Sequence, residues 1–472
     1  MDDTTTRRHW MRLASAGVAG ALQLGAQSAP PSGALEVRVT AGAGRFAAQP
    51  PVPWEPLPER AANAIRLEPW NQYQEMIGFG AAFTDAACWT FNQLAEDARQ
   101  QLFHELFHPS QLGLGAGRLC VGSSDYSRSV YSFDDGPPDP ELQRFSIDHD
   151  RAYILPVLRL ARQMNPDLFL FGSPWSPPGW MKDNGTMLGG TMRKQSFPYY
   201  ARYFVKFLQA YREAGVPVNA VSVQNEVDAE QEGHMPACLW SQEQEWQFVG
   251  EHLGPAFARD KIDTKIWILD HNYDLWGRVL DILAKPEVSR YIDGVAWHGY
   301  VGDPSAMTRV HDAYPAKHAY WTEGGPEYTA PDYLTDWAKW GGTFAEILRN
   351  WARSIIGWNL ALDEKGKPNI GPFPCGGVVT IDSATRQITR SGQYWALAHY
   401  SSAIRRGARR IGSQGEIEKV SHVAFVNPDG GAAVVLANQG AEKNVAIEAL
   451  GHAARIHLPA DSLVTLTGRM PA

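Results

Sequence analysis

Two glutamates, Glu226 and Glu323, each stand at the end of a short β-rich stretch of the sequence, at 221–226 and 320–323. Two carboxyl groups that face each other can cleave an acetal in two steps. One attacks the carbon as a nucleophile, while the other protonates the leaving oxygen and later deprotonates water. A separation of about 5–5.5 Å makes the reaction retain the configuration of the carbon. We predict that these two glutamates form such a pair, with Glu327 as the rival for the second position.

Residues at the ends of other β-rich stretches could assist this pair. The nucleophile must be ionised, whereas the acid needs a pKa that burial or a neighbouring anion has raised. Three residues are expected to keep Glu323 ionised by hydrogen bonds: Arg118, His298 and Tyr300. Four others are expected to hold a sugar ring: Asn225 at its 2-hydroxyl group, Asp85 and Trp358 by gripping it, and Trp175 by stacking. Taken singly, these residues also fit structural roles, as a buried ion pair, a core histidine or ordinary aromatic packing.

The composition excludes several other classes of protein. The net charge is −8 and the pI is near 6.0, so the chain lacks the positive charge that nucleic-acid binding requires. The 17 tryptophans fit either a large core or a sugar-binding cleft. The histidines show no HExxH or other metal-binding spacing. We therefore expect a carbohydrate or glycoconjugate substrate, with neither a metal nor a cofactor, and the sequence specifies no oligomeric state.

The elements that must position these residues alternate between strands and helices. Amphipathic stretches such as 151–164, 199–214 and 242–258 separate eight β-rich stretches: 76–83, 115–122, 168–173, 220–224, 265–269, 294–298, 319–322 and 355–360. This alternation predicts an α/β fold, a (β/α)8 TIM barrel over residues 73–372, whose active site lies at the carboxyl ends of the strands. Glu226 ends the fourth strand and Glu323 the seventh, so both carboxyl groups reach the barrel mouth. We assign Glu226 as the acid/base and Glu323 as the nucleophile.

The last hundred residues have a different pattern. Short strands separated by turn residues are expected at 376–382, 420–427, 432–438, 445–450 and 462–467. The segment 427–431, Asn-Pro-Asp-Gly-Gly, is a strong hairpin turn. We predict an attached antiparallel β-sandwich domain over 373–472, to which a linker and strands in 30–72 contribute.

The first 29 residues resemble an export signal. The pair Arg7-Arg8 precedes a weakly apolar, Ala- and Gly-rich stretch, and small residues follow at 25–29. This pattern predicts a twin-arginine signal and a periplasmic or extracellular location. No stretch of about 18 apolar residues occurs, so stable membrane insertion is not expected. The four cysteines have no CxxC spacing, and we expect them to be buried free thiols.

Several of these stretches together resemble glycoside hydrolase family 30, which includes glucosylceramidases and β-1,6-glucanases. The similar motifs lie in order along about 70–470, at 78–87, 173–182, 224–226, 322–323, 358–363 and 459–462. The resemblance implies a (β/α)8 barrel with a β-sandwich, retaining cleavage of β-glucosidic bonds and no cofactor. It also implies the acid/base role of Glu226, the nucleophile role of Glu323 and the substrate-binding roles given above.

The chain departs from the family pattern at three positions near the site. Val227 replaces a common proline, Ala81 a frequent glycine, and Gly299 an aromatic residue, so the cleft is expected to be more open beside the nucleophile. The alternatives are a β-xylosidase or fucosidase of the same family, a transglycosylase that uses the same intermediate, and a non-catalytic carbohydrate-binding barrel.

Overall fold

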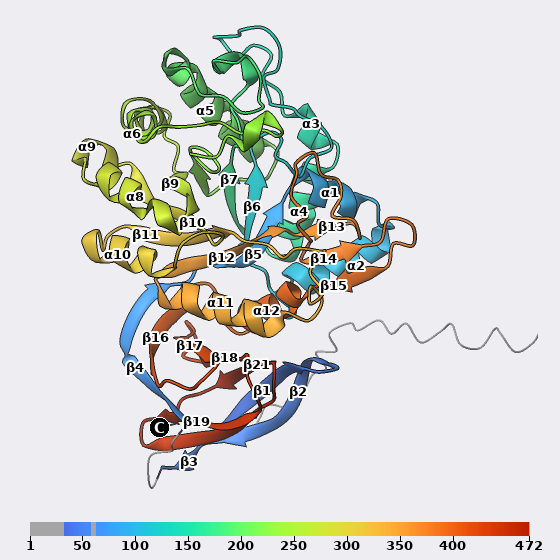
Figure 1. The fold of residues 1–472 in the computed structure, drawn as a ribbon, viewed down its shortest axis with the longest axis vertical. Coiled ribbons are helices and arrows are strands. Elements are labelled where there is room, and N and C mark those ends of the chain that lie inside the picture. The colour runs from blue at the N-terminus through green and yellow to red at the C-terminus, as the bar shows by residue number, and fades with distance from the viewer. Residues whose placement is uncertain (1–32, 58–62, 472) are drawn as a thin grey trace, which may run out of the picture.

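The computed structural model describes residues 33–57 and 63–471 of the chain. The predicted export signal at 1–29 lies outside the described residues. The described chain forms two bodies stacked along the long axis, a barrel with its helices above and a β-sandwich below (Figure 1).

The upper body is a closed barrel of eight parallel strands. In chain order the strands are β5 (Gly78–Phe83), β6 (Ala116–Cys120), β7 (Phe169–Ser173), β8 (Ala220–Ser222), β9 (Lys265–Asn272), β10 (Ile292–His298), β11 (His318–Glu323) and β12 (Ala352–Asn359). Each of the eight predicted stretches overlaps one of them, so the barrel prediction is confirmed.

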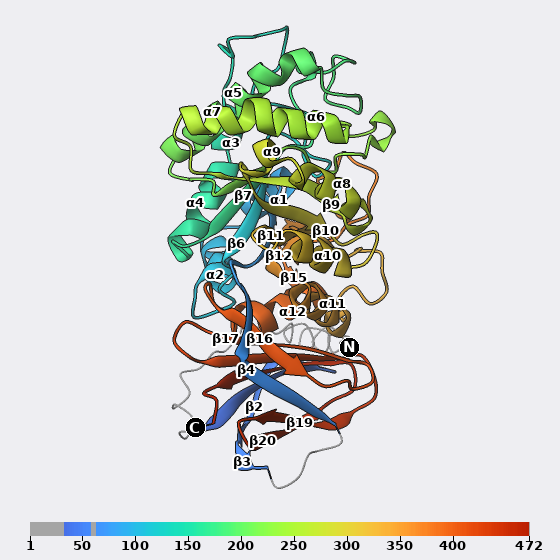
Figure 2. The same cartoon turned by 90° about the vertical axis from the view of Figure 1, so that its left-hand side faces the viewer.

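Helices surround the barrel and connect its strands. Their bounds are α1 (Asp85–Asn92), α2 (Glu96–Phe107), α3 (Asp148–Arg151), α4 (Ile154–Met164), α5 (Phe197–Glu213), α6 (Gln242–Gln247), α7 (Gly254–Arg259), α8 (Trp276–Leu283), α9 (Pro286–Ser289), α10 (Ser305–Ala313), α11 (Trp337–Arg349) and α12 (Gly392–Ser401). The predicted helix at 242–258 consists of α6, a π-helical segment at Phe248–Leu253 and α7, which Figure 2 shows as one continuous rod. Short 3-10 turns lie at Gly179–Met181, Lys194–Ser196, Gln231–Gly233 and Tyr273–Leu275.

Small residues allow the barrel strands to approach closely. Every residue of β5 is buried, and a Cβ atom at Gly80 would lie 1.7 Å from the backbone oxygen of Ala116 on β6. A glycine at this position therefore sets the spacing between the first two barrel strands. Strand β6 also carries Arg118 to the barrel mouth, so this close packing bears on the site as well.

The segment after β12 differs from the prediction. The stretch 376–382, expected in the sandwich, contains β14 (Val379–Ile381), which pairs with β13 (Ala361–Leu362) and β15 (Ile388–Arg390) in a separate three-stranded sheet. Helix α12 follows this sheet and packs against α11 and β5. Strands of the sandwich begin again only with β16 (Arg409–Gln414), so the predicted start of the sandwich at 373 was too early.

The lower body is one ten-stranded sheet that curls around an apolar core. Four of its strands precede the barrel in the sequence, as predicted for 30–72: β1 (Ala34–Ala41), β2 (Gly44–Pro53), β3 (Glu55–Pro56) and β4 (Ala64–Glu75). The others are β16, β17 (Val420–Val426), β18 (Ala432–Asn438), β19 (Lys443–Ala449), β20 (His452–Leu458) and β21 (Ser462–Gly468). Neighbouring strands are antiparallel except β4 and β19, which are parallel.

Helices α11 and α12 join the two bodies, since they lie between the barrel strands and the sandwich in both overall views (Figures 1 and 2). His399 of α12 is fully buried at this junction. Its Nδ1 atom contacts the hydroxyl of Thr465 on β21 at 2.8 Å, and its Nε2 atom contacts that of Thr40 on β1 at 2.9 Å. One side chain thus connects the barrel layer to the first and the last strand of the sandwich.

Two further expectations can be compared with the described residues. All four cysteines are free thiols as predicted, three of them buried and Cys375 partly exposed. Among residues 33–57 and 63–471, no helix combines the length and the apolar character needed to cross a membrane.

Candidate active site

A cavity of about 670 Å³ lies at the carboxyl ends of the barrel strands. It is lined by six of the residues that sequence analysis selected: Trp175, Asn225, Glu226, Tyr300, Glu323 and Trp358. Arg118 and His298 are fully buried directly behind this lining and contact Glu323 and Glu226. The structure therefore brings eight of the nine selected residues together.

Glu226 reaches the cavity through a strained loop. Strand β8 ends at Ser222, and Glu226 adopts a left-handed backbone with φ of +51°. Its backbone N–H donates to the carbonyl of Asp270 at 2.9 Å, which ties the loop to the end of β9. A non-glycine residue in this conformation costs about 1–3 kcal/mol, so the surrounding contacts must hold it in place.

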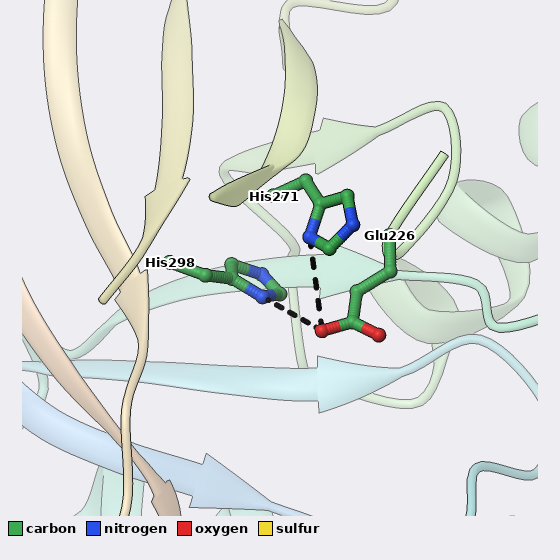
Figure 3. Close-up of side chains that lie close together, drawn as sticks. All are labelled: Glu226, His271 and His298. Atoms are coloured by element: carbon green, nitrogen blue, oxygen red, sulfur yellow. Dashed lines mark ion pairs between the residues drawn. The ribbon is translucent and has the colours of Figure 1, made fainter. Parts of the chain in front are cut away.

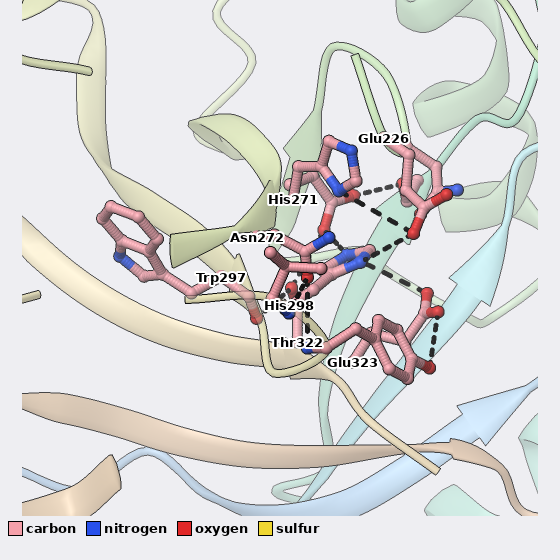
Figure 4. A network of polar contacts seen from close by, with 12 residues as sticks. Glu226, His271, Asn272, Trp297, His298, Thr322 and Glu323 are labelled. Carbon is pink, nitrogen blue, oxygen red and sulfur yellow. Dashed lines mark hydrogen bonds and ion pairs between the residues drawn. The ribbon is translucent and has the colours of Figure 1, made fainter. Parts of the chain in front are cut away.

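The carboxylate of Glu226 faces two imidazoles. Its Oε1 atom lies 3.4 Å from Nδ1 of His298 and 3.8 Å from Nδ1 of His271. The side-chain amide of Gln231 approaches its Oε2 atom at 3.4 Å. Figure 4 shows dashed lines from the His298 ring to both Glu226 and Glu323, within one continuous polar network. His298 is thus the side chain that connects the two glutamates.

Glu323 ends β11 and is held by a cation and a phenol. Arg118 from β6 forms an ion pair with its Oε2 atom. The hydroxyl of Tyr300 donates to Oε1 at 3.0 Å, and Nε2 of His298 lies 3.9 Å from Oε2. The carboxylate thus has one directed donor on each oxygen, which fixes its orientation.

Arg118 and Asp270 form the buried centre of the site. Besides Glu323, the guanidinium donates to Asp270 at 2.8 Å, to Asn225 Oδ1 at 2.7 Å and to Ser173 at 3.1 Å. Asp270 also accepts hydrogen bonds from three hydroxyls, those of Ser173 on β7, Ser222 on β8 and Thr322 on β11. The network therefore locks residues from five barrel strands into one arrangement.

The charges of this network shift the pKa values of its members. Burial lowers the pKa of His298, but the carboxylates of Glu323, Asp270 and Glu226 raise it by more, to about 9. Burial raises the pKa of Glu226, but the contact with His298 and the charges of both histidines lower it by more, so it lies below its usual value. Sequence analysis predicted a raised pKa for the acid. In the structure without a bound sugar the pKa of Glu226 is lowered instead, because two imidazoles face its carboxylate.

Two tryptophans form one wall of the cavity. Trp175 and Trp358 stack with ring centroids 5.1 Å apart and planes 23° from parallel. The guanidinium of Arg118 lies over Trp175, 4.7 Å from its centroid, which fixes the inner edge of this wall. A flat aromatic surface next to two carboxyl groups suits the C–H face of a sugar ring.

Asp85 is the selected residue that the structure places elsewhere. It begins α1, and its carboxylate accepts from the hydroxyl of Tyr153 and from the backbone N–H of Arg128 at 2.8 Å. It is fully buried and does not line the cavity. Its expected role in gripping the sugar stays a prediction, while both of its oxygens are used within the protein, by the loop after β6 and by Tyr153 just before α4.

A different carboxyl group, Asp125, occupies the cavity wall. It lies in the loop after β6, and its Oδ1 atom is buried without a hydrogen-bond partner in the described chain. Burial, reinforced by the charges of Glu323 and Glu226, raises its pKa well above the usual value. An unpaired buried carboxyl oxygen at a cavity surface is ready to accept or donate a hydrogen bond to a ligand.

Sequence reasoning missed Asp125 because it inspected only residues at strand ends. Asp270 lies near the end of β9, and no function was predicted for it from the sequence. His271 follows it and also lines the cavity. The hydroxyls of Ser173, Ser222 and Thr322 stand at or near strand ends too, and this shared position was the signal for a buried network.

Two positions named in the sequence analysis have physical explanations. Gly299 lines the cavity, and a Cβ atom there would lie 2.9 Å from the ring of Trp321. The glycine is thus needed by the packing of Trp321 as well as leaving space beside Glu323. Glu327 lines the cavity further out, in a loop where it forms an isolated β-bridge with Cys375. Arg118 and Tyr300 contact Glu323 instead.

Comparisons with known proteins agree with this arrangement. The profile of the glycosyl hydrolase family 30 TIM-barrel domain matches residues 76–404, and that of the family's beta sandwich domain matches 407–466. The chain is 32% identical to an endo-1,6-beta-D-glucanase of Neurospora crassa over 402 residues, which cover 81% of this chain and 82% of that protein. It is 30% identical to the lysosomal acid glucosylceramidase of Mus musculus, over 80% of this chain and 78% of that protein.

Solved structures give the same result. The endo-beta1,6-glucanase BT3312 superposes with a TM-score of 0.84 at 27% identity, covering 92% of this chain and all of that one. SrfJ from Salmonella typhimurium superposes with a TM-score of 0.88 at 27% identity, over 93% of this chain and all of that one. With both domains matched and a cavity lined by two glutamates, the chain belongs to glycosyl hydrolase family 30 and is an O-glycosyl hydrolase.

Proposed function

We propose that the chain is a retaining β-glucoside hydrolase in which Glu323 is the nucleophile and Glu226 the acid/base. The observation that carries this proposal is that both carboxyl groups line one cavity and approach opposite nitrogens of the same imidazole, that of His298. Arg118 and Tyr300 both contact the carboxylate of Glu323, which supports its role as the nucleophile.

The reaction proceeds in two displacements. A carboxylate oxygen of Glu323 attacks the anomeric carbon, the bond to the leaving oxygen breaks, and that oxygen takes the proton of Glu226. Water then gives a proton to Glu226 and attacks the same carbon, which frees Glu323. A bound sugar buries Glu226 further, and burial is the factor that raises its pKa toward that of an acid.

The sugar would be held by groups on three sides of the cavity. Trp175 and Trp358 supply the stacking wall, and Asp125 offers an unpaired carboxyl oxygen to a hydroxyl group. Because Arg118 occupies Oδ1 of Asn225, the amide nitrogen of Asn225 is left to donate to the sugar. We include Asp125 in place of Asp85 as a substrate-binding residue.

The favoured substrate is a β-1,6-linked glucan. Its support is the similarity to endo-1,6-β-glucanases in both sequence and structure. A glucosylceramide is the second candidate, since the relatives include a glucosylceramidase and apolar side chains surround the cavity. Tyr300, Val301 and Phe373 are 47%, 52% and 39% exposed. A lipid aglycone would bury such a surface.

The role of Glu226 is tested by chemical rescue. Replacing Glu226 with Ala should lower the hydrolysis of an aryl glucoside by about 10²–10⁴-fold, the usual contribution of a general acid or base. Azide should restore turnover and form glucosyl azide, because it replaces the water that the missing base would activate. An Asp228→Ala variant, which removes a nearby carboxylate outside the cavity, serves as the matched control and should form no azide adduct. If Glu226→Ala forms no glucosyl azide and keeps the pH profile of the unchanged protein, the assignment is contradicted.

The sugar and the stereochemistry are tested with a substrate panel. We expect turnover of an aryl glucoside and of gentio-oligosaccharides, with β-glucose as the first product in NMR spectra. Faster cleavage of an aryl xyloside or fucoside would overturn the glucose assignment, and first release of the α-anomer would overturn retention. Glucosylceramide turnover above that of gentio-oligosaccharides would favour the second candidate. Transfer products in excess of hydrolysis would indicate a transglycosylase, and binding without turnover a carbohydrate-binding barrel.

The proposal also includes export through the twin-arginine route to the periplasm or the medium. It is supported by Arg7-Arg8 and the apolar stretch that follows them. Replacing both arginines with lysine should retain the active enzyme in the cytoplasmic fraction. Unchanged export of that variant would contradict this part of the proposal.

A further inference from the structure

Two histidines at the barrel mouth present a ring nitrogen to the same carboxylate oxygen. Figure 3 shows His271 at the end of β9 and His298 at the end of β10, both turned toward Oε1 of Glu226. The two Nδ1 atoms are buried, and neither forms a hydrogen bond within the described chain. Their contacts with Oε1 of Glu226, at 3.8 Å for His271 and 3.4 Å for His298, are too long to satisfy either nitrogen fully, so all three groups can share one ligand.

The opposite nitrogen of each ring is fixed by a carboxylate. Nε2 of His298 lies 3.1 Å from Oδ1 of Asp270, and Nε2 of His271 lies 2.6 Å from Oδ1 of Asp228. A carboxylate on Nε2 fixes the ring so that Nδ1 faces Glu226, and an ion that binds there displaces the proton that the raised pKa of His298 keeps on its Nδ1. Histidines that bind metal ions are oriented in this way, with a carboxylate on the far nitrogen.

We propose that Glu226, His271 and His298 form a binding site for a divalent transition-metal ion such as Zn²⁺ or Cu²⁺, and that this ion inhibits the enzyme. The three ligand atoms lie within 4.8 Å of one another. Bonds of about 2.0–2.2 Å to one tetrahedral ion require ligand atoms roughly 3.3 Å apart, so small side-chain rotations close the site. The cavity supplies water as the fourth ligand, since Glu226 and His271 both line it.

The surrounding charges favour a cation. Three buried or nearly buried carboxylates, Glu226, Asp270 and Glu323, face the guanidinium of Arg118 and the imidazole of His298, and an ion that replaces the proton of His298 adds a further positive charge among them. Two imidazoles and one carboxylate suit zinc and copper, whereas Mg²⁺ and Ca²⁺ prefer oxygen ligands. The site therefore discriminates between these classes of ion. Sequence spacing could not reveal it, because its ligands come from the ends of three different strands.

A bound ion would block catalysis directly. It would take the lone pair of the Glu226 oxygen that faces the histidines and would occupy the space in front of it. This inhibition rests on the proposed role of Glu226, whereas the binding of the ion does not. The two parts can therefore be tested separately.

Binding is tested with Co²⁺ as a spectroscopic probe on the full chain, after treatment with a chelator. We expect one equivalent of Co²⁺ to produce the visible bands of a four- or five-coordinate ion with nitrogen ligands. Zn²⁺ should abolish these bands, and Mg²⁺ or Ca²⁺ should not. A protein that gives no visible bands with Co²⁺ and takes up no Zn²⁺ by calorimetry would overturn the proposal.

Variants assign the site. His271→Gln should lose the cobalt bands, and Asp228→Asn should weaken Zn²⁺ binding by about 10–100-fold, the usual effect of removing a carboxylate behind a ligating histidine. The control is His104→Gln, because exposed His104 at the end of α2 stacks on half-buried His108 just after it, which forms a second histidine pair away from the barrel mouth. This control should bind Zn²⁺ as the unchanged protein does. Equal zinc affinity of His271→Gln and the unchanged protein would contradict the assignment.

Inhibition is read from aryl glucoside hydrolysis in the presence of Zn²⁺. The concentration for half inhibition should match the dissociation constant from calorimetry, and His271→Gln should raise it by at least about tenfold. Zinc bound without loss of activity would refute the inhibitory part. If the metal-free protein does not hydrolyse aryl glucosides at all, the proposed function is contradicted. The cobalt spectrum would still show whether the metal site exists.

Discussion

Two side chains in the site, His298 and Arg118, each contact more than one carboxylate. The ring of His298 faces Glu226 with one nitrogen and Asp270 and Glu323 with the other. Arg118 likewise joins Glu323 to Asp270. A change at either glutamate is therefore felt by the other through these shared partners, and variants of the pair should not be additive.

The nucleophile can be identified by covalent labelling. We expect a 2-deoxy-2-fluoroglucoside with a good leaving group to label Glu323, because the intermediate forms but its hydrolysis is slow. Glu323→Gln should abolish turnover, since an amide is not a nucleophile here and Arg118 loses one of its two anionic partners. Peptide mass spectrometry locates the label. Glu327→Gln is the matched control and should still be labelled at Glu323, whereas label on Glu327 would transfer the role.

Asp125 and Asp85 provide a second test at the scale of residues. Asp125→Asn should lower kcat/KM for an aryl glucoside by about tenfold or more, equivalent to at least about 1.4 kcal/mol of lost transition-state binding, with little change in melting temperature. Asp85→Asn should instead lower the melting temperature, because its two oxygens anchor the loop after β6. The opposite pattern, with kcat/KM lost only in Asp85→Asn, would restore the role predicted from the sequence.

The difference between these two aspartates shows what sequence reasoning can predict about a site. Glu323 and Trp358 lie at the ends of β11 and β12, so their positions follow from the barrel alone, whereas Glu226 lies in the loop after β8 and was found from its neighbouring residues. Asp125 lies further along a loop, and its direction depends on packing that no spacing rule describes. Local pattern thus predicts residues at strand ends well and residues in loops poorly.

At the scale of elements, the barrel strands were predictable because their apolar stretches are short and recur between helices. The stretch 376–382 was misassigned for a physical reason. A strand is recognised from its own residues, but the sheet it joins depends on which edge is free nearby. For β14 that edge belongs to β13, which directly follows the last barrel strand.

Close packing of the barrel strands predicts a large effect at Gly80. Gly80→Ala should destabilise the protein by about 1–3 kcal/mol or more, because the new Cβ atom would overlap the backbone of β6. Gly277→Ala in α8 is the control, since nothing lies within 4 Å of a Cβ atom there. It should stabilise the helix by about 0.5–1 kcal/mol. Urea unfolding measures both, and equal stabilities would contradict the strand spacing described above.

At the scale of the whole molecule, His399 couples stability to pH. Burial lowers the pKa of His399 to about 3, so it stays neutral in the folded state while the unfolded chain takes up a proton near pH 6.5. The unfolded state then binds more protons, and stability falls as pH drops below about 6.5 toward 3.

The prediction is a difference in slope between variants. His399→Gln removes the titrating group at the junction, so its melting temperature should fall less between pH 6.5 and pH 5 than that of the unchanged protein. His104→Gln, an exposed control on α2, should keep the original slope. If the melting temperatures of the His399 variant and the unchanged protein fall equally with pH, then His399 does not make the stability depend on pH.

The path of the chain through the sandwich has a consequence for protein synthesis. Strand β1 pairs with β21, and β4 pairs with β16 and β19, so the first strands to leave the ribosome wait for the last. At about 5–20 residues per second, this wait lasts tens of seconds, while the whole barrel is translated. During that time β1, β2 and β4 present unpaired edges, which favour aggregation. Slow translation, or truncation before β16, should therefore reduce the soluble yield long before it affects the chemistry of the barrel.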